Sequence, residues 1–372
     1  MSNTFDEHID RRGTSSIKWD ITAQDELPMF IADMDFVSAP AVKKRIADRL
    51  EHPVFGYTKA PHQLVDCFIN WFREEYDYDL KREWVVPITG IVPALSVVSN
   101  IGGGSSVTVT PNYHMLLDAP GKAGNQMIRV PLHNENEYYT FDFEALKNAL
   151  LPDTKLIYLC NPQNPVGRIY SLSELKQFEQ FARENNLTVI SDEIHCELLY
   201  DSKHIPFLTV GDYSLENSIS FYAPGKTYNI PGVSMAFAVI PDEDLRNEFN
   251  RLSYAMGHPG LFNIEAGIAA YSESASWRRD LIEYLRGNRD YLESELGKRF
   301  KDARFTHTEA TYLQWVNFGE GIDAGFIRKN AKVVLTDGKD FGAEGYVRIN
   351  FGCPRDYITE ALDRIEKAIA NK

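Results

Sequence analysis

Cysteine is scarce in this sequence. Only four of the 372 residues are cysteines, at positions 67, 160, 196 and 353, and none forms a C-x-x-C pair. This pattern argues against a disulfide framework or a redox dithiol and favours reduced thiols in the cytoplasm. The nine histidines are equally scattered, without an H-E-x-x-H pattern. We therefore expect no metal site.

Long apolar runs and an excess of positive charge are also missing. No stretch approaches the roughly 20 apolar residues that cross a bilayer, and the polar N-terminus does not resemble a signal peptide. Lys and Arg number 39 against 53 Asp and Glu, which gives a net charge of −14. These features predict no membrane or nucleic-acid partner. The apolar share of 44% still supports a large core and two domains.

Hydrophobic patterning predicts that strands and helices alternate from residue 84 onward. Apolar runs of strand length occur at residues 84–87, 106–110, 126–132, 155–160, 187–191, 218–222 and 235–240. Helical patterns intervene at residues 92–100, 141–150, 171–185 and 242–253. Continuous apolar strands are typical of sheets that are buried on both faces. The pattern predicts an α/β fold with a mostly parallel mixed sheet flanked by helices.

The two ends of the chain follow a different pattern. Helices are expected at residues 39–50, 63–76 and 355–369, with a long helical region at 263–300. Strands are expected at residues 312–318, 332–335 and 346–351. We predict a large domain at 50–285. Residues 1–49 and 286–372 are predicted to form a discontinuous, smaller α+β domain.

One lysine, Lys226, lies where burial of its charge would cost free energy. Lys226 follows the apolar run 218–222 at a tight Ala-Pro-Gly turn. A buried lysine is expensive, and it becomes useful where its neutral amine forms a Schiff base. We interpret Lys226 as the attachment point of pyridoxal 5'-phosphate (PLP). The alternatives are a surface turn or a phosphate-binding P-loop, but the P-loop pattern requires glycine at position 220, where this chain has Ser220.

Two further stretches follow predicted strands on the N-terminal side of the lysine. Gly90 turns a strand into a helix, so the N–H groups of Gly90, Ile91 and Val92 are candidates for binding an anion. Tyr113 comes shortly after the strand that ends at residue 110, where its ring could stack on a planar ligand. Taken alone, each also fits an ordinary turn or a core tyrosine.

Two polar residues stand in more unusual surroundings. Asn164 lies in an N-P-x-N-P-x-G loop at residues 161–167, whose prolines restrict the backbone and hold the amide still. Asp192 ends a buried apolar strand, where a carboxylate is expensive unless it has a partner. A protonated pyridine nitrogen is such a partner. A helix N-cap or a buried salt bridge is the alternative for Asp192.

The order of these elements resembles the fold-type I PLP enzymes of the class I/II aminotransferase superfamily. A narrower resemblance is to the MalY/PatB-type cystathionine β-lyases, which are C–S lyases. It rests on the opening segment 5–20, on A-D-M-D-F at 32–36, on S-D-E-I-H at 191–195 and on A-P-G-K-T at 223–227. The resemblance implies the PLP-dependent transferase-like fold and covers nearly the whole chain.

The resemblance also implies roles for individual residues. Lys226 would bind PLP and act as the base at the substrate Cα, and Asp192 would pair with the pyridine nitrogen. Asn164 would bond the phenolic oxygen and lie in the substrate site, while Tyr113 would stack on the ring. Arg348 would hold the carboxylate of an amino-acid substrate in a bidentate pair, which suits arginine better than lysine. Its alternative is a surface arginine.

Other implied roles concern the phosphate and the partner subunit. The phosphate would lie at Gly90, Ile91 and Val92. Tyr57 matches a tyrosine that reaches the phosphate of a neighbouring subunit, which implies a homodimer with shared active sites. His195 stands where many relatives have tyrosine, so it belongs with the cofactor-binding residues although its partner is open. Ser234 and Gly225 replace a common arginine and a common serine.

The resemblance implies an activity with one main alternative. A C–S β-lyase would convert cystathionine or another cysteine S-conjugate to a thiol, pyruvate and ammonia. The same groups could instead support a broad-specificity aminotransferase. A regulatory protein with this fold is a third reading, and nothing in the sequence requires it.

Overall fold

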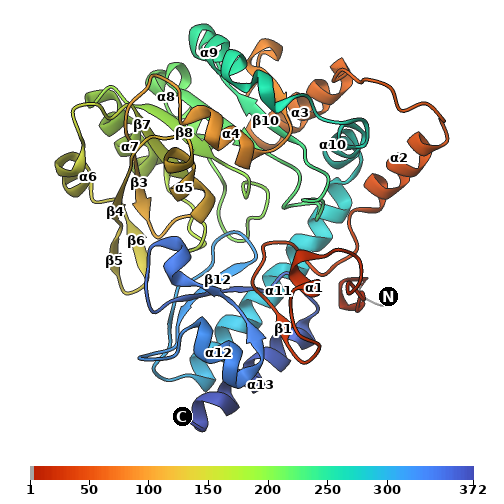
Figure 1. The fold of residues 1–372 in the computed structure, drawn as a ribbon, viewed down its shortest axis with the longest axis vertical. Coiled ribbons are helices and arrows are strands. Elements are labelled where there is room, and N and C mark those ends of the chain that lie inside the picture. The colour runs from red at the N-terminus through yellow and green to blue at the C-terminus, as the bar shows by residue number, and fades with distance from the viewer. Residues whose placement is uncertain (1–3) are drawn as a thin grey trace.

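The largest sheet has seven strands in the order β2-β10-β9-β8-β7-β3-β4 (Figure 1). Its strands are β2 (Val85–Ile88), β3 (Ser106–Thr110), β4 (Met127–Pro131), β7 (Leu156–Cys160), β8 (Thr188–Asp192), β9 (Ser218–Tyr222) and β10 (Ala236–Val239). Strand β10 runs antiparallel to the other six strands of this sheet, which all run in one direction. The computed structural model describes residues 4–372, and it confirms the predicted α/β fold with a mostly parallel mixed sheet.

Helices cover both faces of this sheet because its strands are apolar on both sides. In β8, Val189 packs in a cluster with residues of α6 and α7, while the next residue, Ile190, packs with residues of α4, α5 and α9. The helices are α1 (Ile17–Asp20), α2 (Pro40–Leu50), α3 (His62–Tyr76), α4 (Ile91–Val98), α5 (His114–Lys122), α6 (Phe143–Ala149), α7 (Leu172–Glu184), α8 (Asp212–Glu216), α9 (Glu243–Ser253), α10 (Leu261–Glu273), α11 (Ala275–Arg299), α12 (Ala324–Ala331) and α13 (Arg355–Ala370).

The predicted helical region at 263–300 is confirmed, and it consists of two helices, α10 and α11, which divide at Ser274. The Ser274 hydroxyl donates to the carbonyl of Ala269 at 2.9 Å and fixes this break. Helix α5 was not predicted, because Pro120 lies inside it and the helical pattern there is short.

A second sheet lies toward the C-terminus, with strands in the order β11-β12-β15-β14. Its strands are β11 (Arg304–Phe305), β12 (Leu313–Asn317), β14 (Thr336–Asp337) and β15 (Val347–Asn350). Two further pairs are the hairpin of β5 (His133–Glu135) with β6 (Tyr138–Thr140), and β1 (Leu27–Pro28) with β13 (Val333–Val334). The predicted strand at 332–335 is short: β13 pairs with β1, and the chain returns to the second sheet at β14.

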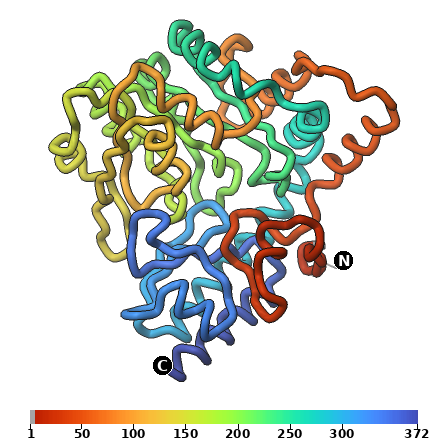
Figure 2. Tube along the Cα trace, viewed as in Figure 1, coloured from red at the N-terminus to blue at the C-terminus, as the bar shows by residue number. Residues whose placement is uncertain are grey.

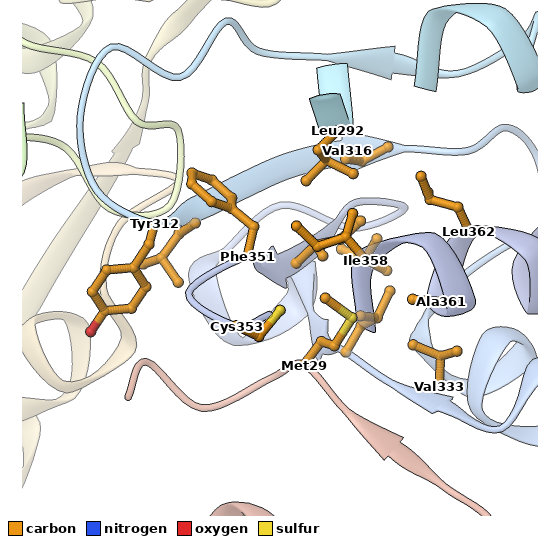
Figure 3. Packing of buried hydrophobic residues seen from close by; sticks show 14 of the residues in the cluster. Met29, Leu292, Tyr312, Val316, Val333, Phe351, Cys353, Ile358, Ala361 and Leu362 are labelled. Atoms are coloured by element: carbon orange, nitrogen blue, oxygen red, sulfur yellow. The ribbon is translucent and has the colours of Figure 1, made fainter. Parts of the chain in front are cut away.

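The N-terminal segment shares a core with the C-terminal part. Met29 packs in one cluster with Val333, Cys353 and Ile358 (Figure 3). Strand β1 pairs in parallel with β13, so two segments about 300 residues apart lie side by side. This agrees with the idea of a discontinuous small domain. Its boundaries at 1–49 and 286–372 stay a prediction, and residues 1–3 lie outside the described part.

The link between α2 and α3 projects from the body of the molecule, as the tube in Figure 2 shows at the right. Its apolar side chains Val54, Phe55 and Tyr57 are exposed. Among residues 4–372, no helix combines the length and the apolar character that crossing a membrane requires.

Candidate active site

A cavity of about 510 Å³ lies beyond the carboxyl ends of the parallel strands, where α/β sheets carry their sites. Every predicted site residue except Tyr57 lines it: Gly90, Ile91, Val92, Tyr113, Asn164, Asp192, His195, Lys226 and Arg348. A larger, more open hollow of about 700 Å³, with Asp6, Glu283 and Arg355 on its walls, contains none of them. The chemistry suggested by the sequence therefore converges on the smaller cavity.

Lys226 follows β9 on a series of turns that begins at Pro224. Its Nζ donates to the carbonyl of Ala32 at 2.6 Å. Burial, followed by the positive charge of Arg348, lowers the pKa of Lys226 to about 8. About a fifth of the amine is therefore neutral at physiological pH, far more than for an ordinary lysine. No helix begins at Lys226, so the P-loop alternative is wrong.

Asp192 ends β8 with its carboxylate 2% exposed. Its Oδ1 accepts a hydrogen bond from the backbone N–H of Ile194 at 3.2 Å. Burial raises the pKa of Asp192 to about 6, although the charge of Lys226 acts in the other direction. Within the described part of the chain, no arginine or lysine forms a salt bridge with it. The salt-bridge alternative is therefore wrong, and the carboxylate is available to a cationic partner.

Behind Asp192, a buried network holds the end of β8. Glu193 accepts hydrogen bonds from His204 Nε2 at 2.6 Å and from the Tyr222 hydroxyl at 2.9 Å on one oxygen. Its other oxygen accepts from the Ser191 hydroxyl and from the N–H of Phe207. Both oxygens of Glu193 are satisfied, so this residue fixes the direction in which its neighbour Asp192 faces.

Arg348 lies on β15 and is only 4% exposed, so it is not a surface arginine. One guanidinium nitrogen donates to Asn164 Oδ1 at 3.0 Å, and another donates to the carbonyl of Phe30 at 2.9 Å. Burial lowers the pKa of Arg348 to about 10. Its Nε is buried without a partner, and no carboxylate pairs with it in residues 4–372. This cation is therefore available for an anionic ligand.

The aromatic residues of the cavity are Tyr113 and two histidines. Burial, with a contribution from Asp192, raises the pKa of Tyr113 to about 12. Burial and the charges of Lys226 and Arg348 hold the pKa of His195 well below its ordinary value. Its Nδ1 is buried and has no partner among the described atoms. His195 is therefore a neutral imidazole with unused hydrogen-bonding capacity.

Glycine at position 90 permits the turn from β2 into α4. Gly90 has φ 150°, which other residues rarely adopt, and α4 begins at the next residue, Ile91. Ser234 and Gly225 line the same cavity. A Cβ atom added at Gly225 would meet Pro231 Cα at 3.5 Å, which is ordinary contact. The backbone therefore leaves room for a small side chain at this position.

Sequence reasoning missed several residues of the cavity wall. Ile17, Ile31, His114 and Met115 line it, but none of them was assigned to the site. The available signals were the position of Ile17 in the segment 5–20, that of Ile31 just before A-D-M-D-F, and the adjacency of His114 and Met115 to Tyr113. Tyr57 does not line the cavity of its own chain, because the α2–α3 link carries it outward. In the described residues, no cluster of potential metal ligands occurs.

The cavity beyond the carboxyl ends of the parallel strands brings together a lysine of lowered pKa, a buried carboxylate and, from the second sheet, a buried arginine. This arrangement defines an enzyme that acts on a small carboxylate-bearing molecule. The model of the class I and II aminotransferase family matches residues 29–365. The chain belongs to that family.

Relatives and solved structures make the resemblance more specific. The chain is 34% identical to the cystathionine β-lyase PatB of Bacillus subtilis, over 98% of this chain and 100% of that protein. It is 31% identical to the protein MalY of Escherichia coli, over 98% of both. The PLP-bound C–S lyase of Staphylococcus hominis superposes with a TM-score of 0.91 at 31% identity, covering 98% of this chain and 97% of that one.

Proposed function

We propose that this protein is a PLP-dependent C–S β-lyase. It cleaves cystathionine or another cysteine S-conjugate to a thiol, pyruvate and ammonia. The observation that carries the proposal is the meeting of three buried groups, Lys226, Asp192 and Arg348, in one cavity. The similarity to PatB and to the Staphylococcus hominis C–S lyase over nearly their full lengths supports it.

The residues of the cavity fit PLP. Asp192 is a buried carboxylate that lacks a cationic partner, and a protonated pyridine nitrogen would supply one. Tyr113 would lie against the ring, while the Asn164 amide and the unpartnered His195 are the donors for the phenolic oxygen. Lys226 would bind the cofactor covalently. The phosphate would lie at the start of α4, on the N–H groups of Gly90, Ile91 and Val92.

The chain's own groups supply binding and proton transfer. When bound, PLP withdraws negative charge from the Cα of an amino acid. Arg348 holds the α-carboxylate and so fixes which Cα bond faces Lys226. The lysine amine accepts the Cα proton, a task for which a pKa near 8 is well matched. The same proton is then available on Nζ for the departing sulfur or for the cofactor carbon.

The destination of that proton separates the two candidate activities. Loss of a sulfur leaving group from Cβ gives elimination, whereas return of the proton to the cofactor gives amino transfer. The family model, which describes aminotransferases, keeps the second activity as the alternative. The similarity to proteins named as lyases favours elimination.

Pyruvate release is the test of this proposal. The purified protein, loaded with PLP, is incubated with L-cystathionine or other cysteine S-conjugates and no keto acid. We expect pyruvate and free thiol in equal amounts. No pyruvate from any conjugate, together with amino transfer once a keto acid is added, would replace the lyase by the aminotransferase.

We also propose a homodimer in which Tyr57 completes the site of the partner. Tyr57 is fully exposed on the projecting α2–α3 link, next to the exposed apolar side chains of Val54 and Phe55. Exposed apolar groups gathered on one link favour a protein contact.

A cytoplasmic location fits the free cysteines, of which Cys160, Cys196 and Cys353 are buried.

Mixing two defective variants tests the shared site. The Tyr57→Ala and Lys226→Ala proteins are each expected to be nearly inactive. After dissociation and reassociation of an equal mixture, random pairing leaves one intact site in each mixed dimer, so about a quarter of the wild-type activity should return. Tyr254→Ala, which removes another exposed tyrosine, is the control and should keep activity. Failure of the mixture to regain activity contradicts a site completed across the dimer.

A further inference from the structure

The segment 30–33 runs past the two buried cations of the cavity. The carbonyl of Phe30 accepts a hydrogen bond from Arg348 at 2.9 Å, and the carbonyl of Ala32 accepts one from Lys226 at 2.6 Å. Ile31 lies between these two contacts and lines the cavity. In the proposed function, Arg348 holds the substrate carboxylate and Lys226 faces Cα. The side chain of a bound amino acid therefore extends from a point close to Ile31.

Asn350 holds this segment, which bends at residues 31 and 32, in place. Its Nδ2 donates to the carbonyl of Ile31 at 2.5 Å and to the carbonyl of Asp33 at 2.7 Å. The carbonyls of residues 31 and 33 thus face Asn350, while those of residues 30 and 32 face the cations. The Tyr312 hydroxyl also donates to the carbonyl of Ala32 at 2.9 Å. With both sets of carbonyls engaged, the wall at Ile31 is fixed in place.

The wall around the substrate side chain carries no charge. Ile17 and Ile31 come from the N-terminal part of the chain, and Met115 comes from α5. The neighbouring His114 has a lowered pKa, because of burial and then of the charge of Arg348, so its imidazole is neutral at physiological pH. Among the described residues that line the cavity, the charged ones are those already assigned to PLP and to the α-carboxylate: Asp192, Lys226 and Arg348.

Asp33, a further carboxylate whose charge acts on Lys226, is already paired. Asp33 Oδ2 accepts from Arg11 at 2.7 Å, and Lys18 Nζ lies 3.9 Å from its other oxygen. Arg11 in turn bridges to Asp35 at 2.6 Å. Asp33 is therefore part of an ion-pair network that fastens the N-terminal segment, and it is not free to bind an ammonium group from a substrate.

We propose that the preferred substrate is a cysteine S-conjugate whose sulfur carries an uncharged, apolar group. This inference rests on the proposed lyase function and narrows it. Cystathionine has the same reacting half, but its departing half carries an ammonium and a carboxylate. Placing both charges against Ile31 and Met115 leaves them without side-chain partners, which is costly. An apolar substituent has no such cost and gains from burial.

A matched pair of substrates tests this preference. S-butyl-L-cysteine and L-cystathionine have four-carbon chains on sulfur and differ in the charged end. We expect kcat/KM for S-butyl-L-cysteine to be higher by about tenfold or more, the discrimination typical of a missing polar partner. We also expect S-butyl-L-cysteine to bind more tightly than L-cystathionine. The dissociation constants are measured by calorimetry on PLP-loaded Lys226→Ala, which cannot turn the substrates over.

Two exposed isoleucines, one at the start of the short helix α1 and one just after its end, provide a variant and its control. Ile17 begins α1, lines the cavity and is 67% exposed, so Ile17→Glu places a carboxylate on the wall without disturbing the core. It should shift the kcat/KM ratio severalfold toward cystathionine, because its charge can pair with the distal ammonium. Ile21 follows α1, is 63% exposed and does not line the cavity. Ile21→Glu should leave the ratio unchanged.

The outcomes separate the substrate preference from the lyase activity. Equal or better turnover and binding of cystathionine would overturn the apolar preference while leaving the lyase in place. An Ile17→Glu protein with the wild-type ratio would also overturn it. If neither compound releases pyruvate, the lyase proposal fails, and the two dissociation constants still decide whether the wall prefers an uncharged side chain.

Discussion

Replacing Lys226 by alanine is expected to lower pyruvate release by about 10³–10⁴-fold, since it removes both the covalent link to PLP and the base at Cα. Its amine is the group whose buried position lowers the pKa to about 8. The cofactor absorbance at the blue edge of the visible spectrum should be lost or shifted in the same variant. Lys176→Ala is the control, because Lys176 lies exposed on α7 and should be dispensable.

Chemical rescue distinguishes a missing base from a misfolded protein. Removal of the Lys226 side chain leaves space beside the carbonyl of Ala32, to which its Nζ donated. Methylamine added to the Lys226→Ala enzyme should restore part of the rate, in proportion to the concentration of neutral amine and so increasing with pH. Full activity of the variant without added amine would exclude Lys226 from the chemistry.

The second large effect is expected for Asp192→Asn, and it has opposite signs for activity and stability. Loss of the charge opposite the pyridine nitrogen should lower pyruvate release by about 10²-fold or more. The PLP-free protein should become more stable, because burial raises the pKa of Asp192 to about 6 from the ordinary 3.8. That difference corresponds to about 3 kcal/mol against the charged carboxylate.

The pH dependence fixes the sign of this stability change. With a folded-state pKa above the unfolded one, the protonated carboxyl is favoured in the folded protein. The free-energy cost of burying the charged carboxylate of Asp192 is therefore absent below about pH 4. It grows between pH 4 and 6 and is complete above pH 6. Urea unfolding of the PLP-free proteins should show Asp192→Asn to be more stable at pH 7.5 and unchanged at pH 4. Equal stability at both pH values would mean that the carboxylate has a partner in the free protein.

The strands and the residues at their ends could be predicted because both depend on local sequence. Strands β3 and β9 coincide with their predicted apolar runs, and the end of β8 brings Asp192 to the edge where Lys226 also lies. Parallel strands place their carboxyl ends together, so residues far apart in sequence meet there without any knowledge of side-chain packing.

The wall of the substrate pocket could not be predicted in the same way. The contact between Phe30 and Arg348 joins residues that are 318 positions apart, and no periodic pattern marks either of them as neighbours. Helix α5 was missed for a local reason, the proline at position 120. Because α5 was missed, His114 and Met115 were missed with it. They line the cavity together with Ile17 and Ile31 from the N-terminal part of the chain.

The same long-range contact has a consequence for synthesis on the ribosome. Residues 27–35 are made first, yet their partners on β13 and β15 are translated about 300 residues later. Domains generally fold as they emerge, so the lysine turn and its sheet can form before the substrate pocket is closed. A chain that terminates before Arg348 lacks the proposed carboxylate clamp and the partner of the 30–33 segment. The reactive amine therefore gains a substrate site only in a nearly finished molecule.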